Sequence, residues 1–264
     1  MPTPDLPNSC TPDTAPSPAQ RRAADAYADW KSWRHEDFGR PTAQASAYFN
    51  LLWRRFIGAR RTCVQVLEIG FGNGQFLGWS RQRGLTACGI ETNEALLARA
   101  HAAGFDCAGS LATLDAGPFD LIVLFDVLEH IPESGITAFL CSVSGRLAPQ
   151  GQILLRTPNG GSPFGLNNQY GDPTHAAVLT PNKLKFLSAP AGLQVAFSGA
   201  DPRPLRGLPA AKWPALALRL LLQRLLESLV RFVFAPLPRG VLAANLLTVL
   251  RHSTQGRQRS GIGA

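Results

Sequence analysis

The sequence lacks the patterns that identify a disulfide-bonded or metal-binding protein. Its five cysteines, Cys10, Cys63, Cys88, Cys107 and Cys141, are odd in number and scattered, and no C-x-x-C pair occurs among them. Disulfide or metal use is therefore not expected, and a reducing compartment fits this distribution. Cys63, Cys88 and Cys107 lie in or beside apolar runs, which favours a role as small buried side chains. No Ser-His-Asp arrangement and no internal repeat occurs either.

The first segment of the chain lacks an apolar run. Residues 1–18 are rich in proline, without a basic start or a hydrophobic stretch. This composition is not that of a secretory signal and predicts a disordered tail. Residues 19–60 carry aromatic and aliphatic side chains among charges and predict an N-terminal helical cap. The alternative is that these helices merely cover the edge of a sheet in the core of the protein.

Acidic residues are scarce in the last quarter of the chain. The formal net charge is +8; residues 1–200 contain 16 Lys/Arg and 16 Asp/Glu, whereas residues 201–264 contain 10 and 2. The whole excess of positive charge therefore lies after residue 200. Such a block indicates an anionic partner, either a membrane surface or an acidic ligand, and we expect no nucleic acid. A solvated basic face is the alternative.

Residues 64–74 form the stretch around which the other motifs are arranged. An apolar run ends at Ile69 and is followed by Gly70, Gly72 and Gly74, and then by a helix start. Strand, glycine turn and helix is the layout of a nucleotide-binding crevice in an open parallel sheet. Glycine permits the sharp turn and lets a ligand touch the main chain. The spacing is not G-x-G-x-x-G, and a tight turn without a ligand is the alternative.

A second predicted strand, residues 85–90, ends in an acidic residue. Glu91 follows Gly74 by 17 residues, close to the spacing of an acid that binds ribose hydroxyls. A carboxylate can accept two hydrogen bonds from a vicinal diol, which explains the residue type. A carboxylate serving a helix N-terminus is the weaker alternative, because Asn93 and Glu94 already serve that end.

Three stretches carry a resemblance to a known family. Residues 68–74, E-x-G-x-G-x-G, resemble the first motif of the class I S-adenosylmethionine-dependent methyltransferases. Residues 126–132, D-V-L-E-H-I-P, are similar to the E/D-V-L-E-H segment of small-molecule O-methyltransferases, including those of ubiquinone biosynthesis. Residues 170–175, Y-G-D-P-T-H, followed by Thr180 and Pro181, resemble methyltransferases encoded with cell-surface polysaccharide pathways. Thr180 is a predicted helix N-cap with Pro181 as the first helical residue. Before this loop, residues 149–151 are expected to form a turn that leads into a strand over 152–156. The resemblance covers about residues 45–198, with a last strand near 245–250.

The resemblance implies a fold and a cofactor. The fold is a Rossmann-like α/β sheet of seven strands, six parallel and one antiparallel, with helices on both faces. The cofactor is S-adenosylmethionine, held by Glu68, Gly70, Gly72, Gly74, Glu91, Ser110 and Asp126. The family often places an acid after the third strand to bind adenine, where this chain has residues 108–111, Ala-Gly-Ser-Leu. Ser110 or backbone groups are the expected substitute.

The acceptor side of the site is predicted from two histidines. An alcohol needs help to lose its proton before methylation, and His130 and His175 are candidate general bases, with Asp172 beside them on the loop. The alternative for His130 is local hydrogen bonding that shapes the wall of the cofactor site, and the alternative for Asp172 and His175 is that they pin the loop internally. The resemblance favours O-methylation of a sugar in a cell-surface glycan or its lipid-linked precursor. A prenylated phenol or quinone precursor is the second candidate acceptor, and a catalytically inactive membrane-associated scaffold is the third interpretation.

A long apolar segment precedes the last strand. Residues 213–234 are long enough to suggest a membrane span, but Arg219, Gln223, Glu227 and Arg231 recur every four residues as a polar stripe. An amphipathic helix is therefore predicted, docked on protein or lying peripherally on the cytoplasmic face of a bilayer. The predicted organisation is a methyltransferase core over 61–200, a basic helical insertion over 201–242, and a last strand with a polar tail over 243–264. The oligomeric state stays open.

Overall fold

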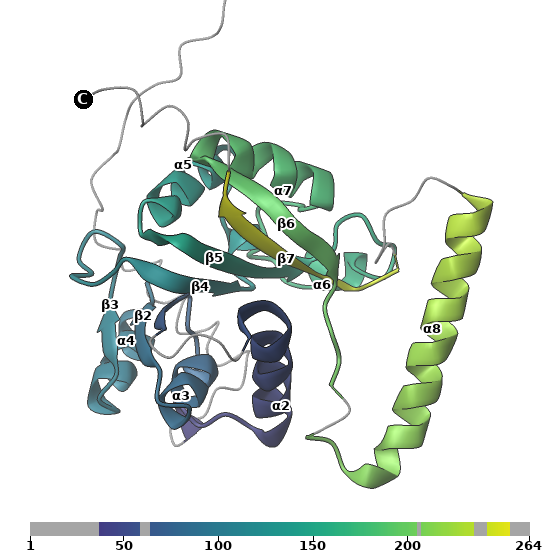
Figure 1. Cartoon of the computed structure of the whole chain (residues 1–264), viewed down its shortest axis with the longest axis horizontal. Coiled ribbons are helices and arrows are strands. Elements are labelled where there is room, and N and C mark those ends of the chain that lie inside the picture. Colours follow the sequence, from purple (N-terminus) through teal and green to yellow (C-terminus); the bar gives the residue numbers. More distant parts are fainter. Residues whose placement is uncertain (1–36, 59–63, 205–206, 235–241, 254–264) are drawn as a thin grey trace, which may run out of the picture. The chain divides into compact units, whose positions relative to one another are not determined.

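The computed structural model describes residues 37–58, 64–204, 207–234 and 242–253 (Figure 1). The expectations for the tail 1–18, for most of the N-terminal cap, for Cys10 and Cys63, and for the polar tail after residue 253 lie outside these residues.

The centre of the fold is a sheet of seven strands. They are β1 (Gln65–Ile69), β2 (Thr86–Ile90), β3 (Asp106–Ala108), β4 (Phe119–Phe125), β5 (Leu147–Pro158), β6 (Leu193–Ala200) and β7 (Asn245–His252). Their order is β3-β2-β1-β4-β5-β7-β6. Neighbouring strands are parallel along the stretch β3-β2-β1-β4-β5, whereas β7 runs antiparallel to both β5 and β6. The Rossmann-like sheet with one antiparallel strand, predicted from the sequence, is confirmed.

Helices connect the strands along the chain. They are α2 (Ala43–Leu52), α3 (Gln75–Gln82), α4 (Glu94–Ala102), α5 (Glu133–Ser144), α6 (Leu166–Tyr170), α7 (Pro181–Ser188) and α8 (Trp213–Val233), with a π-helical turn η2 (Trp53–Ile57) and a 3₁₀ turn η3 (Leu128–His130). The predicted cap of α7 is confirmed, because the Thr180 hydroxyl accepts a hydrogen bond from the Lys183 N–H at 3.2 Å and Pro181 opens the helix.

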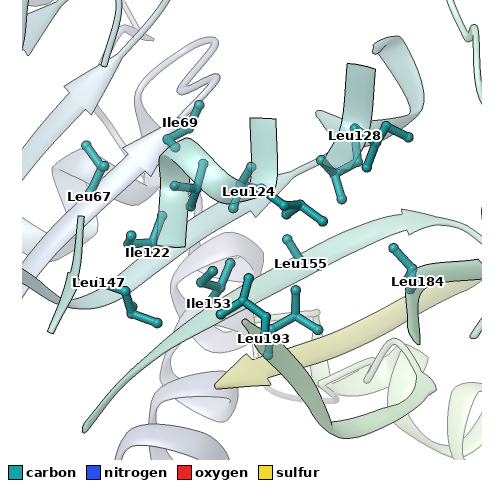
Figure 2. Close-up of a cluster of buried hydrophobic side chains, with 14 of the residues drawn as sticks. Leu67, Ile69, Ile122, Leu124, Leu128, Leu147, Ile153, Leu155, Leu184 and Leu193 are labelled. Carbon is teal, nitrogen blue, oxygen red and sulfur yellow. The ribbon is translucent and has the colours of Figure 1, made fainter. Parts of the chain in front are cut away.

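Two hydrophobic clusters cover the two faces of the sheet. Alternate residues of each central strand point to opposite sides, since side chains along a strand alternate. Ile122 and Leu124 of β4 join a cluster with α5 and α7, part of which is drawn in Figure 2. Leu121 and Val123 of the same strand join a second cluster with the aromatic residues of α2 and α3. Figure 1 shows the same division, with α5 and α7 on one face and α2 and α3 on the other.

The structure differs from the sequence prediction in two segments. Strand β5 begins at Leu147, although Pro149 to Gly151 were expected to form a turn. A shift in the pairing register with β4 absorbs these residues, and a Cβ on Gly151 would lie 2.7 Å from the Phe119 carbonyl oxygen. The loop over 160–180 contains the short helix α6, a single turn that its many Gly, Pro and Asn residues conceal in the sequence.

Helix α8 is present as predicted between β6 and β7, and none of its residues is buried. Its large apolar side chains are exposed, among them Leu218, Leu221, Leu222, Leu225, Leu229 and Phe232. Among the described residues, no helix combines the length and the apolar character that crossing a bilayer requires.

The strand order locates the functional edge of the sheet. The chain places β2 on one side of β1 and β4 on the other, so the order of the strands reverses at β1. Open α/β sheets bind ligands at such a reversal, outside the carboxyl ends of the strands. The glycine turn after β1, Glu91 after β2 and Asp126 after β4 all lie at this edge.

Candidate functional site

The glycine turn is a backbone cradle. Gly70, Gly72 and Gly74 have φ values of 71°, 52° and 67°, in the left-handed region that residues with a Cβ rarely adopt. A Cβ on Gly70 would lie 2.7 Å from Cγ2 of Val127. The turn therefore places main chain without side chains at the ligand-binding edge; Gly70 is half-buried, and Gly72 and Gly74 are buried. Such a bare turn fits the close approach of a nucleoside cofactor.

Glu91 braces this turn from the neighbouring strand. Its Oε2 accepts a hydrogen bond from the Gly72 N–H at 3.0 Å, and its Oε1 accepts one from the Asn93 N–H at 3.0 Å. Asn93 itself caps α4 by accepting bonds from Ala95 and Leu96. Glu91 is therefore not the cap of that helix. A carboxylate has about four lone-pair positions, so capacity remains for two ribose hydroxyls.

Glu68 lies beneath the turn. Its side chain is buried, and its Oε2 accepts a hydrogen bond from the Leu77 N–H in the first turn of α3 at 3.1 Å. Burial raises the pKa of this carboxyl well above its usual range. This geometry ties β1 to α3 and makes Glu68 a residue that shapes the cradle. The cofactor-binding role expected of it stays a prediction.

Ser110 follows β3, close in sequence to the backbone that contacts Glu91. The Glu91 N–H donates to the Ala108 carbonyl at 3.2 Å, which joins the ends of β2 and β3. The Ser110 hydroxyl lies 3.1 Å from the Thr113 hydroxyl, in a local turn. The expected substitution of Ser110 for the family's acidic adenine ligand stays a prediction.

Asp126 is held in an unusual backbone conformation at the end of β4. Its φ is 58°, the only positive φ among the described residues other than glycine. Its carboxylate forms an ion pair with Arg156, whose Nε donates to Oδ1 at 3.0 Å. The Arg156 guanidinium also lies over the ring of Phe125, 5.1 Å from its centroid. Asp126, which was predicted to bind the cofactor, is therefore ion-paired with Arg156, a residue that no sequence motif indicated.

Tyr48 and Asp201 form a second polar contact that was not predicted from the sequence. The Tyr48 hydroxyl in α2 donates to Oδ1 of Asp201, after β6, at 2.6 Å. Burial raises the pKa of the Asp201 carboxyl to about 6 and also raises that of Tyr48 well above its usual value. No spacing pattern in the sequence connects residues 48, 156 and 201, because each comes from a different element.

The structure brings together the three predicted catalytic residues. His130 ends η3, and its ring lies 4.7 Å from that of His175, centroid to centroid. Nε2 of His175 lies 3.8 Å from Oδ2 of Asp172. The loop that carries Asp172 and His175 is fastened to η3, because the Glu129 carbonyl accepts hydrogen bonds from the N–H groups of Ala176 and Ala177. Two segments more than 40 residues apart thus form one polar cluster.

Hydrogen bonds identify which nitrogen of each imidazole holds its proton. Nδ1 of His175 lies 2.9 Å from the Gln169 carbonyl, which can only accept, so Nδ1 is the donor. The Thr174 hydroxyl donates its single proton to Oδ1 of Asp172 at 2.5 Å. It must therefore accept from Nδ1 of His130, 2.9 Å away. In their neutral forms both imidazoles then present the lone pair on Nε2.

Glu129 completes the cluster, although the sequence reasoning passed over it. Its side chain is fully buried, and neither carboxylate oxygen has a hydrogen-bond partner among the residues that the structure describes. Burial, assisted by the nearby charge of Asp126, raises the pKa of this carboxyl to about 8. Its place beside His130 in D-V-L-E-H was the available signal, but the two oxygens' lack of partners is visible only in three dimensions.

Comparison with known proteins agrees with this geometry. The family model of a methyltransferase domain matches residues 17–196. A search of curated proteins finds no match. Among solved structures, a SAM-dependent methyltransferase from Archaeoglobus fulgidus has a TM-score of 0.54 at 21% identity, covering 78% of this chain and 93% of its own.

Two other solved structures are similar in fold. A methyltransferase in complex with the Trm112 activator from Haloferax volcanii has a TM-score of 0.57 at 15% identity, covering 88% of this chain and 97% of its own. The plantazolicin methyltransferase BamL, solved with a triazolic desmethylPZN analogue and S-adenosylhomocysteine, has a TM-score of 0.52 at 15% identity, covering 89% of this chain and 91% of its own. The family match extends over more than half of the sequence, and the glycine cradle and Glu91 fit its cofactor. The chain therefore belongs to the methyltransferase-domain family and is a class I S-adenosylmethionine-dependent methyltransferase.

Proposed function

We propose that the enzyme methylates a hydroxyl group of a sugar in a cell-surface glycan or its lipid-linked precursor. The observation that carries this proposal is the cluster of His130, His175 and Asp172 at the ligand-binding edge. A sugar hydroxyl is a weak acid, so its methylation needs groups that draw away its proton. Lone pairs on the two Nε2 atoms and the carboxylate of Asp172 supply such groups.

The chemistry assigns simple tasks to the chain. S-adenosylmethionine, when bound, supplies an electrophilic methyl group on a sulfonium. The chain holds the acceptor oxygen in line with that methyl carbon and promotes loss of the hydroxyl proton. The acceptor oxygen forms a bond to carbon, the carbon–sulfur bond breaks, and its electron pair stays on sulfur. Gly70, Gly72, Gly74 and Glu91 bind and orient the cofactor in this proposal, with Ser110 and Asp126 at its adenine and methionine sides.

Exposed apolar side chains that lie close in sequence to Asp172 and His175 support an acceptor surface in this proposal. Phe164, Leu166 and Tyr170 lie on the same loop as Asp172 and His175, and Tyr170 is 71% exposed. Ring and aliphatic surfaces suit the C–H face of a sugar as well as a lipid chain. They also suit a prenylated phenol, which is the second candidate because the D-V-L-E-H segment resembles enzymes of that pathway. The intact cradle disfavours an inactive scaffold.

Helix α8 supports a site of action at the cytoplasmic face of a membrane. Leu218, Leu225 and Leu229 are each more than half exposed and share one side of the helix, which is apolar throughout. Lys212, Arg219, Arg224 and Arg231 accompany a single acid, Glu227. An apolar stripe with a cationic border is the pattern of a helix that lies in the interface of an anionic bilayer. A lipid-linked acceptor would be met at that surface.

The proposed function is tested by methyl transfer to defined acceptors. The enzyme is incubated with methyl-labelled S-adenosylmethionine and, in separate reactions, with lipid-linked oligosaccharide and a prenylated phenol, followed by mass spectrometry. Label on a sugar oxygen supports the proposal. Label on the phenol alone selects the second candidate. Label on neither, with the cofactor still bound, contradicts both acceptor classes.

A further inference from the structure

We infer that Glu129, His130 and His175 form a binding site for a divalent cation of the Zn²⁺ or Co²⁺ type. The inference rests on the proposed function, because it explains how the same cluster activates the acceptor hydroxyl. The ligand-capable atoms of these three residues all lie within 4.8 Å of one another. One carboxylate and two imidazoles are the protein ligands of a known class of catalytic zinc site, which leaves a further position for water or substrate.

The buried carboxylate of Glu129 is the first observation that calls for a cation. Its side chain is fully buried, and both oxygens lack hydrogen-bond partners within the described part of the chain. Burying a carboxylate without a compensating partner is costly, and groups in this position are normally paired or bound to metal. A cation between Glu129 and the two imidazoles would satisfy both oxygens and offset the burial.

The orientation of the two imidazoles is the second, independent observation. Nδ1 of His130 donates to the Thr174 hydroxyl, which is itself bonded to Asp172, and Nδ1 of His175 donates to the Gln169 carbonyl. Histidines that bind metals almost always donate their other N–H to a carbonyl, a carboxylate or a similar acceptor. Thr174, Asp172 and Gln169 are therefore positioning residues, which orient each neutral ring so that Nε2 is the nitrogen without a proton.

The separation of the ligand atoms decides how much the site must adjust. Ligand atoms about 2.0–2.1 Å from a tetrahedral zinc lie about 3.4 Å apart, so pairs of ligand atoms separated by as much as 4.8 Å must approach by up to about 1.4 Å on binding. Rotation of side chains can supply this contraction. No metal site was expected from the sequence, because its cysteines are scattered and form no C-x-x-C pair. The ligands proposed here come from η3 and from the loop after α6, with no fixed spacing between them.

The cation would change how the acceptor loses its proton. A hydroxyl oxygen that occupies the open position of the cation becomes more acidic, as a metal-bound water does. Its proton leaves to solvent, and the resulting alkoxide attacks the methyl carbon while the carbon–sulfur bond breaks. The imidazoles then act on the hydroxyl as metal ligands and keep their Nδ1 protons. The overall products are a methyl ether, S-adenosylhomocysteine and one released proton.

Titration with Co²⁺ alone tests the site directly. Untagged enzyme is stripped with chelator, desalted and titrated by calorimetry and visible absorption. One Co²⁺ per chain, with d–d bands of nitrogen and oxygen ligation, is expected. Glu129→Gln and His175→Ala should remove the bands, and Thr174→Val should weaken binding by roughly 10–100-fold, as loss of such outer partners does. His101→Ala, whose imidazole contacts the Cys107 carbonyl away from the cluster, should bind as the wild type does.

Binding of S-adenosylhomocysteine to the same preparations separates this inference from the proposed function. It also shows whether each variant is folded. No Co²⁺ binding by wild-type enzyme that binds S-adenosylhomocysteine overturns the metal site and leaves the methyltransferase intact. Co²⁺ binding that persists unchanged in both Glu129→Gln and His175→Ala also overturns it. If the enzyme binds Co²⁺ but methylates none of the hydroxyl acceptors, the result supports the metal site and counts against the proposed function.

Discussion

The Gly72 N–H donates a hydrogen bond to Oε2 of Glu91 at 3.0 Å, which joins the glycine turn after β1 to the acidic residue after β2. The two sequence features selected as cofactor ligands are thus one structural unit. The contact also means that a change at either residue disturbs the other, so each prediction on this unit needs a control elsewhere in the chain.

Gly72→Val should abolish measurable cofactor binding while leaving the fold largely intact. Gly72 is buried and has a φ of 52°, so a branched side chain there is strained and would intrude on the proposed cofactor position. Gly84→Val is the matched control, because Gly84 has a φ of 73° and no neighbour within 4 Å of an added Cβ. Calorimetry with S-adenosylhomocysteine makes the measurement. Unchanged affinity in Gly72→Val would show that the ligand lies elsewhere.

Glu91→Ala should weaken cofactor binding at least about tenfold. Removing a charged acceptor from hydroxyl groups costs about 1.5–3 kcal/mol, and about 1.4 kcal/mol corresponds to one decade of affinity. Glu94→Ala, three residues along at the start of α4, removes a carboxylate outside the cradle and should leave the affinity unchanged. A change of less than about twofold in Glu91→Ala would remove the ribose-binding role.

His130→Ala and His175→Ala should each lower turnover by roughly 10²–10⁴-fold, the usual contribution of assisted proton removal. The affinity for S-adenosylhomocysteine should stay the same, because neither imidazole belongs to the cradle. His101→Ala serves as the control. Full turnover in both variants would leave positioning alone as the means of catalysis.

Asp201→Asn should alter how stability depends on pH. Burial raises the pKa of the Asp201 carboxyl from 3.8 to about 6, so the folded protein binds more protons than the unfolded chain between these values. The contribution of this carboxyl to the free energy of unfolding therefore falls by about 1–3 kcal/mol as pH rises from about 4 to about 6. An asparagine oxygen can still accept from Tyr48 without ionising. The variant should be more stable than wild type at pH 7 and equal to it at pH 4.

Thermal unfolding at pH 4 and at pH 7 provides this measurement. The exposed Asp115→Asn change is the control and should leave the stability at both pH values unchanged. An Asp201→Asn variant less stable than wild type at pH 7 would show that the ionised carboxylate stabilises the fold.

Liposome co-sedimentation tests α8. Binding to vesicles with anionic lipid should exceed binding to neutral vesicles and should fall at high salt. Leu225→Glu places a charge on the exposed apolar side and should reduce binding, whereas Gln223→Glu places the same charge on the polar stripe and should reduce it less. Equal and negligible sedimentation in all conditions would exclude the membrane role and leave the apolar side for a protein contact, such as a second subunit.

Most of the fold could be predicted from the sequence because its strands are recognisable from local residue patterns. Short apolar runs bounded by glycine, such as residues 64–70, are typical of buried strands in the centre of a sheet. The cap at Thr180 and the strand before Asp126 were likewise local signals. Strand β5 was predicted too short, since the bulge that accommodates Pro149 to Gly151 depends on the pairing with β4.

The candidate site was predicted in part, and the missing residues share one property. Glu91, His130 and His175 stand in recognisable motifs. Arg156 and Asp201 have no motif, because their partners, Asp126 and Tyr48, come from distant parts of the chain. Glu129 was in view within a motif, but its burial without hydrogen-bond partners is a tertiary property. Contacts between polar residues that are distant in the sequence therefore could not be predicted from these local residue patterns.

Calorimetric titration of the wild-type enzyme with S-adenosylhomocysteine, alongside Gly72→Val and Gly84→Val, tests the central claim most directly. The cradle formed by the glycine turn and Glu91 predicts saturable binding of one ligand per chain by the wild type and by Gly84→Val, and its loss in Gly72→Val. Absence of binding to folded wild-type protein, or equal binding by all three, would contradict the assignment of this edge of the sheet as the cofactor site.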